Sequence, residues 1–151
     1  IPILERSDGP PIYDSRVICE YLDSVFQGSL YGQSPDRWES KVVEATSDGM
    51  LDAAILMVYE KRYREDKMQS IEWLEGQWGK VQSAVRALNN NWMPYLSGSL
   101  KIGHIGVGCA LNYIDFRHSN RDWREDNAEL SSWYSEFEKR PSMKDSVLID
   151  Y

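Results

Sequence analysis

The feature that most constrains this chain is a long apolar stretch at 100–117, with the sequence LKIGHIGVGCALNYIDFR. It carries no Asp, Glu, Lys or Arg between Lys101 and Asp115. Its apolar residues recur at spacings of three and four, which predicts a helix, and the opposite face is apolar as well. A helix that is apolar nearly all round belongs in the interior of a protein. The stretch is too short and too rich in glycine to span a membrane, which needs ~20 apolar residues.

Three glycines interrupt this predicted core helix, at Gly103, Gly106 and Gly108. Each glycine weakens a helix by roughly 1 kcal/mol relative to alanine, so we expect a structural reason for them. Because a glycine has no side chain, neighbouring helices can approach closely at these positions. The chain is therefore expected to build a tightly packed helical core around this element.

Composition limits the classes of function. At 151 residues the chain holds about one to one and a half domains, and its six tryptophans and nine tyrosines supply large apolar surfaces for a core. A net charge of −7 argues against a nucleic-acid partner, whose binding surface is basic. Cys19 and Cys109 lie in predicted helices, which favours buried, reduced thiols in a cytoplasmic protein. His104, His118 and Asp115 are too sparse for a metal site, and a structural role for His104 near the start of the core helix is favoured.

The first part of the chain predicts a small α/β unit. Apolar runs at 1–5 and 12–13 flank a turn signal, SDGPP at 7–11, so we expect a β-hairpin. A helix at 16–24 follows, with Ser15 as its N-cap. A hairpin of two strands is only marginally stable by itself. We therefore expect the chain to be a piece of a longer polypeptide, with partner strands before the first residue.

The remainder of the chain predicts helices. The segment at 27–34 is rich in glycine and serine and indicates a linker. Amphipathic and apolar patterns then predict four helices and an irregular tail, with expected ranges of 35–64, 70–92, 100–117 and 125–139. The predicted fold class is mostly α. Residues 1–26 form a hairpin-plus-helix unit, 27–34 a linker, and 35–151 an all-helical domain.

Six short motifs follow one another along the whole chain. They are IPIL at 1–4, YDSRVI at 13–18, EYL at 20–22, DGMLDAA at 48–54, GHI at 103–105 with GCAL at 108–111, and RPSM at 140–143. In this order they resemble the cytosolic glutathione transferases, and in particular their bacterial YibF-type branch. The resemblance implies that residues 1–26 are the C-terminal half of a thioredoxin-like, glutathione-binding domain. Residues 35–151 would then be the helical C-terminal domain of that family.

The resemblance also implies a glutathione site. Pro2 matches the cis-proline of the family, which presents the backbone of Ile1 to the cysteinyl part of glutathione. Asp14 and Ser15 match the pair that holds the γ-glutamyl end. A serine at a helix N-terminus suits a carboxylate, and Asp14 adds negative charge for the ammonium group. Two alternatives stay open from the residues alone, namely a trans edge-strand proline at Pro2 and a plain helix cap at Ser15.

The acceptor substrate is expected between the two domains. Large apolar or adaptable side chains of the first long helix are its candidate walls, namely Trp38, Met50, Met57 and Tyr59. The alternative for each of them is a core position. Asp48 and Asp52 lie four residues apart on one face of the same helix, and the resemblance implies that a carboxylate from this helix can reach the glutathione ammonium. The sequence does not choose between the two.

The residue that activates the glutathione thiol is not assigned. The resemblance implies a Ser, Cys or Tyr near the start of a helix that would lie upstream of Ile1. Neither Tyr13 nor Cys19 matches that position, so the chain by itself is expected to be inactive. A free thiol has a pKa near 8.5, which is why such a group is needed at neutral pH.

The resemblance therefore predicts a glutathione transferase that conjugates the glutathione thiolate to small hydrophobic electrophiles. It implies a cytoplasmic homodimer that serves detoxification, with glutathione as co-substrate and no other cofactor or metal. No nucleic-acid or membrane partner is expected. The alternative is a non-catalytic relative that uses the same fold for binding or assembly. A stand-alone helical interaction domain ranks last, because it leaves the hairpin without a purpose.

Overall fold

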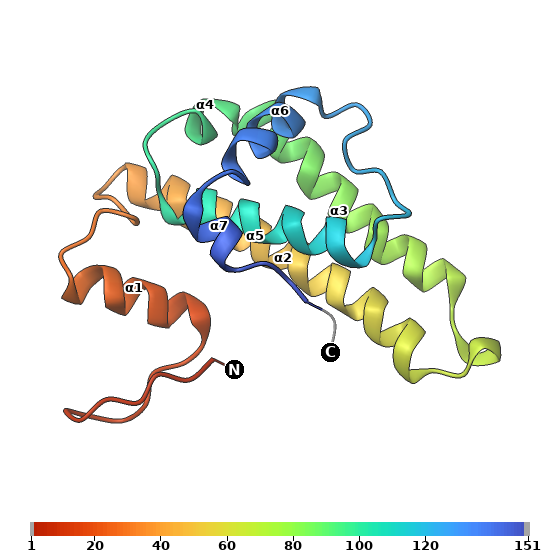
Figure 1. The fold of residues 1–151 in the computed structure, drawn as a ribbon, viewed down its shortest axis with the longest axis horizontal. Coiled ribbons are helices and arrows are strands. Elements are labelled where there is room, and N and C mark those ends of the chain that lie inside the picture. The colour runs from red at the N-terminus through yellow and green to blue at the C-terminus, as the bar shows by residue number, and fades with distance from the viewer. Residues whose placement is uncertain (1, 150–151) are drawn as a thin grey trace.

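The computed structural model describes residues 2–149, and this part of the chain is mostly helical (Figure 1). The elements are α1 (Ser15–Val25), α2 (Asp36–Tyr63), the short 3-10 helix η1 (Asp66–Met68), α3 (Ile71–Asn91), α4 (Met93–Leu96), α5 (Ile102–Arg117), α6 (Ala128–Phe137) and α7 (Pro141–Asp145). The predicted mostly-α fold class is confirmed. The short helix α7 lies where the sequence predicts an irregular tail. None of the helices described is long and apolar enough to cross a membrane.

The predicted hairpin is present only as a reversal of the chain with one antiparallel bridge. Leu4 and Ile12 exchange two backbone hydrogen bonds, each 2.9 Å long. Within residues 2–149 the pairing extends no further, so no strand forms there. Pro10 and Pro11 explain part of this limit, because a proline has no backbone N–H to give to a ladder. In Figure 1 this segment lies beside α1, away from the other helices.

Helix α5 occupies the centre of the helical part, as predicted. It packs chiefly against α2, which also packs against α3 (Figure 1). The close-approach prediction for the glycines is confirmed. A Cβ atom built on Gly103 would lie 2.8 Å from the Val43 Cβ atom, and one built on Gly108 would lie 2.5 Å from a ring carbon of Phe137. Gly106 faces the Ser47 hydroxyl at similarly close range.

Both histidines are structural. The backbone N–H of Lys101 donates to His104 Nδ1 at 3.2 Å, which ties down the start of α5. His104 is buried, and burial lowers the pKa of its imidazole, so the ring is neutral. His118 Nε2 lies 2.9 Å from the carbonyl oxygen of Ala54 and links the end of α5 to α2. The structural role predicted for His104 is confirmed. Across residues 2–149, no three His, Cys, Asp or Glu side chains gather as metal ligands would.

The segment predicted as a linker is held firmly in place. The Asp23 carboxylate accepts hydrogen bonds from the backbone N–H groups of Leu30 (3.1 Å) and Tyr31 (3.3 Å). The carbonyl oxygen of Leu30 accepts from the N–H of Ile102 at 2.9 Å, which joins the segment to the start of α5. Tyr31 is 2% exposed. The segment therefore fixes α1 relative to the helical core.

Two further expectations are corrected. Asp14, and not Ser15, is the N-cap of α1, because its side chain accepts from the N–H of Arg16. Cys109 is exposed, whereas a buried thiol was expected on a helix that is apolar nearly all round. Cys19 is half-buried. The face of α5 that carries Cys109 is therefore left open by residues 2–149.

Candidate functional site

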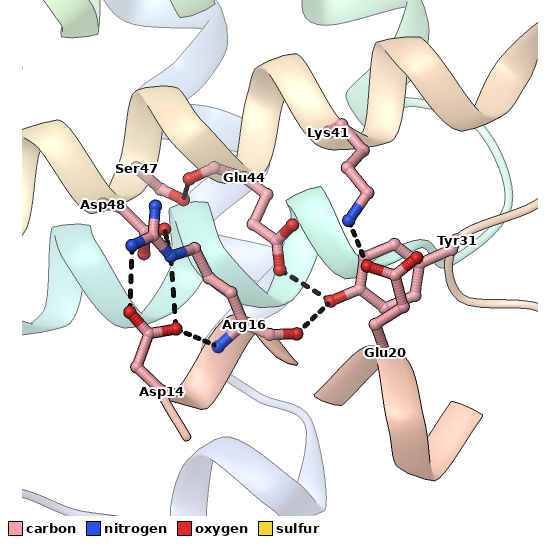
Figure 2. Close-up of polar contacts among 8 residues, drawn as sticks. All are labelled: Asp14, Arg16, Glu20, Tyr31, Lys41, Glu44, Ser47 and Asp48. Atoms are coloured by element: carbon pink, nitrogen blue, oxygen red, sulfur yellow. Dashed lines mark hydrogen bonds and ion pairs between the residues drawn. The ribbon is translucent and has the colours of Figure 1, made fainter. Parts of the chain in front are cut away.

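The first turn of α1 meets the middle of α2, and polar side chains gather there (Figure 2). The Asp14 carboxylate caps α1 through a 3.1 Å bond from the N–H of Arg16. Ser15 is the first helical residue and is exposed. The earliest N–H groups of a helix have no partner within the helix, and the first backbone bond of α1 runs from Ile18 to Asp14. Ser15 therefore presents an N–H and a hydroxyl at a positive helix end.

Two carboxylates converge on one cation at this point. Arg16 Nη2 lies 2.9 Å from Asp14 Oδ2, and Arg16 Nε lies 3.5 Å from Asp48 Oδ2. The hydrogen bonds from Arg16 lower the pKa of Asp14. Burial raises the pKa of Asp48, and Arg16 partly offsets that effect. The Asp48 Oδ2 atom is buried and makes no hydrogen bond. The pair is thus suited to hold a cationic group, and one carboxylate oxygen has hydrogen-bonding capacity to spare.

The structure distinguishes the two aspartates that the sequence left as alternatives. Asp48 belongs to the cluster with Asp14 and Arg16 (Figure 2). Asp52 is exposed one turn further along α2. Its charge raises the pKa of Asp48, so the two carboxylates are neighbours that repel each other. Asp48 is therefore the α2 carboxylate that joins the cluster around Arg16.

A second group of residues lies behind the first turn of α1, and sequence reasoning missed it. The Tyr31 hydroxyl donates to Glu44 Oε1 at 2.7 Å and lies 3.3 Å from the carbonyl oxygen of Arg16. Glu44 is buried, and burial raises the pKa of its carboxyl. Glu20 of α1 is paired with Lys41 and Arg37 nearby. The only signal in the sequence is a tyrosine within a segment of small polar residues.

The remaining predicted site residues are scattered. Pro2 is exposed near the Leu4–Ile12 bridge, and Ile1, with the Ile1–Pro2 peptide bond, lies outside the described residues. Trp38 and Tyr59 are exposed on α2, at 66% and 45%. Tyr59 lines a shallow pocket with Tyr63 of α2 and Trp73 of α3.

Met50 and Met57 are not available to a ligand in this structure. Their exposed fractions are 1% and 0%, and both belong to the core cluster that includes Leu111 of α5. The helical stripe of α2 marks them as apolar but does not say which way the stripe faces. Because both are buried within this cluster, they are core residues. Of the four predicted acceptor residues only Trp38 and Tyr59 are exposed, and about 30 Å of helix α2 separates them.

The burial of Glu44 leads to a prediction for stability against pH. Its pKa is raised on folding, so the folded chain binds more protons than the unfolded chain between the two pKa values. Stability therefore falls as the pH rises through that window and stays lower above it. Glu44→Gln removes this charge, and we expect the variant to be at least as stable as wild type at pH 8. Its urea midpoint should also change less between pH 5 and 8. Glu39→Gln, an exposed change on the same helix, is the control and should follow wild type.

The known proteins that are similar to this chain belong to one family. A family model described as the glutathione S-transferase C-terminal domain matches residues 71–136. The uncharacterized GST-like protein YibF of Escherichia coli K12 is 28% identical over 86% of this chain. The chain spans 66% of the length of that relative.

Solved structures of the same family are also similar to this chain. A glutathione transferase family member from Pseudomonas fluorescens Pf-5, with bound S-(propanoic acid)-glutathione, is 36% identical with a TM-score of 0.92. The match covers 99% of this chain and 78% of that one. The same family member was also solved with bound glutathione. A glutathione S-transferase from Methylobacillus flagellatus KT, with glutathione bound, is 32% identical with a TM-score of 0.86, over 99% of this chain and 76% of that one.

Proposed function

The chain belongs to the glutathione transferase family, and from that premise we propose that the full-length protein joins the thiolate of glutathione to small hydrophobic electrophiles. In this reaction the thiol first loses its proton. The sulfur lone pair then forms a bond to an electrophilic carbon, and the electron pair displaced from that carbon either departs with a leaving group or takes up a proton on a neighbouring atom. The contribution of the protein is to stabilise the thiolate and to orient two substrates.

The observation that carries the proposal is the first turn of α1. The γ-glutamyl carboxylate of glutathione is assigned to the hydroxyl and N–H of Ser15, because a helix N-terminus attracts anions. The γ-glutamyl ammonium is assigned to Asp14 and Asp48, which both lie within ion-pair distance of Arg16. The ammonium would take over part of the role of Arg16. The relatives from P. fluorescens and M. flagellatus that bind glutathione support this assignment.

The other parts of the site follow from the family. Pro2 and the backbone of Ile1 are assigned to the cysteinyl part of glutathione, in strand-like pairing. Trp38 and Tyr59 are both exposed aromatic residues of α2, but about 30 Å of helix separates them, so one of the two at most is assigned to the acceptor pocket. The domain division proposed is 1–26 for the thioredoxin-like part, 27–34 for the connection and 35–151 for the helical domain. A cytoplasmic homodimer that serves detoxification is proposed with it.

No residue described here is assigned to thiol activation. Burial raises the pKa of the Cys19 thiol, which is the opposite of what a nucleophilic or thiolate-stabilising cysteine requires. Tyr13 is 67% exposed and lies before the cap of α1. The chain of residues 1–151 is therefore expected to be inactive by itself. The activating group is proposed to come from elsewhere in the full-length protein.

The test is whether the full-length protein is retained on immobilised glutathione and catalyses glutathione conjugation. We expect it to bind glutathione-agarose, to elute with free glutathione, and to conjugate glutathione to a chlorodinitrobenzene at a rate above the uncatalysed reaction. Retention without conjugation would favour the alternative, a non-catalytic relative that binds glutathione. Failure to be retained would contradict the proposal.

A charge test addresses the ammonium assignment. Asp48→Asn keeps the shape of the side chain and removes its charge, so we expect glutathione to bind about fivefold more weakly, because a charge-assisted hydrogen bond is lost. Asp52→Asn is the matched control, one turn away and exposed, and should bind within about twofold of wild type. Calorimetric titration with glutathione and with its analogue lacking the ammonium group measures both. The analogue should not distinguish wild type from Asp48→Asn, and an equal loss for both ligands would remove Asp48 from the ammonium site.

A further inference from the structure

Helix α1 is held in place by polar contacts. None of its residues is fully buried, and apolar side chains such as Val17 and Val25 are about half exposed. Among residues 2–149, buried apolar packing therefore does not fix this helix. Its position, and with it the position of Ser15, depends on the hydrogen bonds and ion pairs that join α1 to α2 and to the connecting segment.

The contacts between α1 and α2 differ in their surroundings (Figure 2). The ion pairs of Glu20 with Lys41 and Arg37 have side chains that are 31% to 39% exposed. Exposed ion pairs contribute little, because water and salt screen them. The Tyr31 hydroxyl, in contrast, bonds to Glu44 in a place where Tyr31 is 2% and Glu44 6% exposed. A buried hydrogen bond to a carboxyl group is both stronger and costlier to lose.

Tyr31 also reaches α1 directly. Its phenol oxygen lies 2.7 Å from Glu44 Oε1 on α2 and 3.3 Å from the carbonyl oxygen of Arg16 in the first turn of α1. Burial raises the pKa of the phenol, so it keeps its proton and remains a donor. The single phenol proton is thus shared between an acceptor on α2 and a more distant acceptor on α1 next to Ser15, and Figure 2 shows the hydroxyl between them.

We propose that Tyr31 and Glu44 are positioning residues that set the first turn of α1 against α2 and so place Ser15 for glutathione. Neither side chain is assigned a contact with the ligand. The part that concerns glutathione rests on the proposed function, whereas the part that concerns α1 does not. Loss of the bridge should therefore loosen the helix start and raise the KM for glutathione without changing the chemical step.

The experiment compares three variants of the full-length protein. Tyr31→Phe removes the bridging hydroxyl and keeps the ring. Glu44→Gln keeps an acceptor for Tyr31 and serves as the conservative variant. Tyr95→Phe is the matched control, because the Tyr95 hydroxyl donates to Ser40 on α2, one turn before Glu44, at 3.1 Å without touching α1. Amide hydrogen exchange of residues 16–18 and the steady-state constants for glutathione are measured for each.

For Tyr31→Phe we expect faster exchange at residues 16–18 and a KM for glutathione raised about three- to tenfold, with kcat at saturating glutathione within about twofold of wild type. Glu44→Gln and Tyr95→Phe should resemble wild type in both readouts. Unchanged exchange in Tyr31→Phe, or the same loss in Tyr95→Phe, would overturn the proposal. If wild type does not bind glutathione, the proposed function fails, and the exchange rates alone still decide whether Tyr31 positions α1.

Discussion

Replacing Gly103 by alanine is expected to lower the free energy of unfolding by about 2 kcal/mol. The added methyl group would lie 2.8 Å from the Val43 Cβ atom and 2.7 Å from the Tyr95 hydroxyl oxygen. Atoms at that distance must move apart, and Val43 is fully buried. Overpacking of a dense core costs about 1–3 kcal/mol. Urea titration of the full-length protein, followed by tryptophan fluorescence, measures the change.

A glycine-to-alanine change at an open position of α2 should change the free energy of unfolding in the opposite direction. A Cβ atom built on Gly49 of α2 has no neighbour within 4 Å, so Gly49→Ala is a matched control. It should raise the free energy of unfolding by up to about 1 kcal/mol, because alanine favours a helix more than glycine does. Equal effects of the two changes would mean that α5 does not approach α2 as closely as described.

Replacing Ser15 by alanine is expected to weaken glutathione binding of the full-length protein by at least about tenfold. The change removes one hydroxyl donor to a carboxylate, and hydrogen bonds to charged groups contribute about 1.5–3 kcal/mol. It should leave α1 intact, because Asp14 and not Ser15 caps the helix. Isothermal titration calorimetry measures the affinity, and circular dichroism checks the helix content.

Ser24→Ala is the control for this prediction. Ser24 is an exposed serine in the last turn of the same helix, remote from the helix N-terminus. It should bind glutathione as wild type does. Equal affinities of Ser15→Ala and wild type would remove Ser15 from the site, whereas equal losses in both serine variants would indicate a general effect of weakening α1.

The core of the fold could be predicted because its signal is local. The apolar periodicity of 100–117 and its glycines predict a buried helix with close neighbours, and α5 has both properties. The exact residue at which a helix starts is harder to predict. Asp14 and Ser15 are adjacent residues that both make good caps, and the pattern does not say which one adopts the extended backbone of the cap. Helix α7 was missed because five residues are too few for a period to appear.

The candidate site was only partly predictable, since its parts come from distant positions. The motif at 13–18 points to the first turn of α1, but the contact of Arg16 with Asp48 joins residues far apart in the sequence. Tyr31 was placed in a linker because its neighbours are small and polar, and its bond to Glu44 leaves no periodic trace. Met50 and Met57 were predicted to line the acceptor pocket because an apolar stripe on a helix has the same residue pattern whether it faces a core or a cleft.

The central claim is that the N-terminus of α1 receives the γ-glutamyl end of glutathione. A crystal structure of the full-length protein with glutathione tests it most directly. The predicted result is a γ-glutamyl carboxylate within hydrogen-bond distance of the Ser15 hydroxyl and N–H, with the ammonium group between Asp14 and Asp48. Glutathione seated elsewhere, for instance in the groove that α4 and α6 form beside Trp133 and Arg140, would contradict the account.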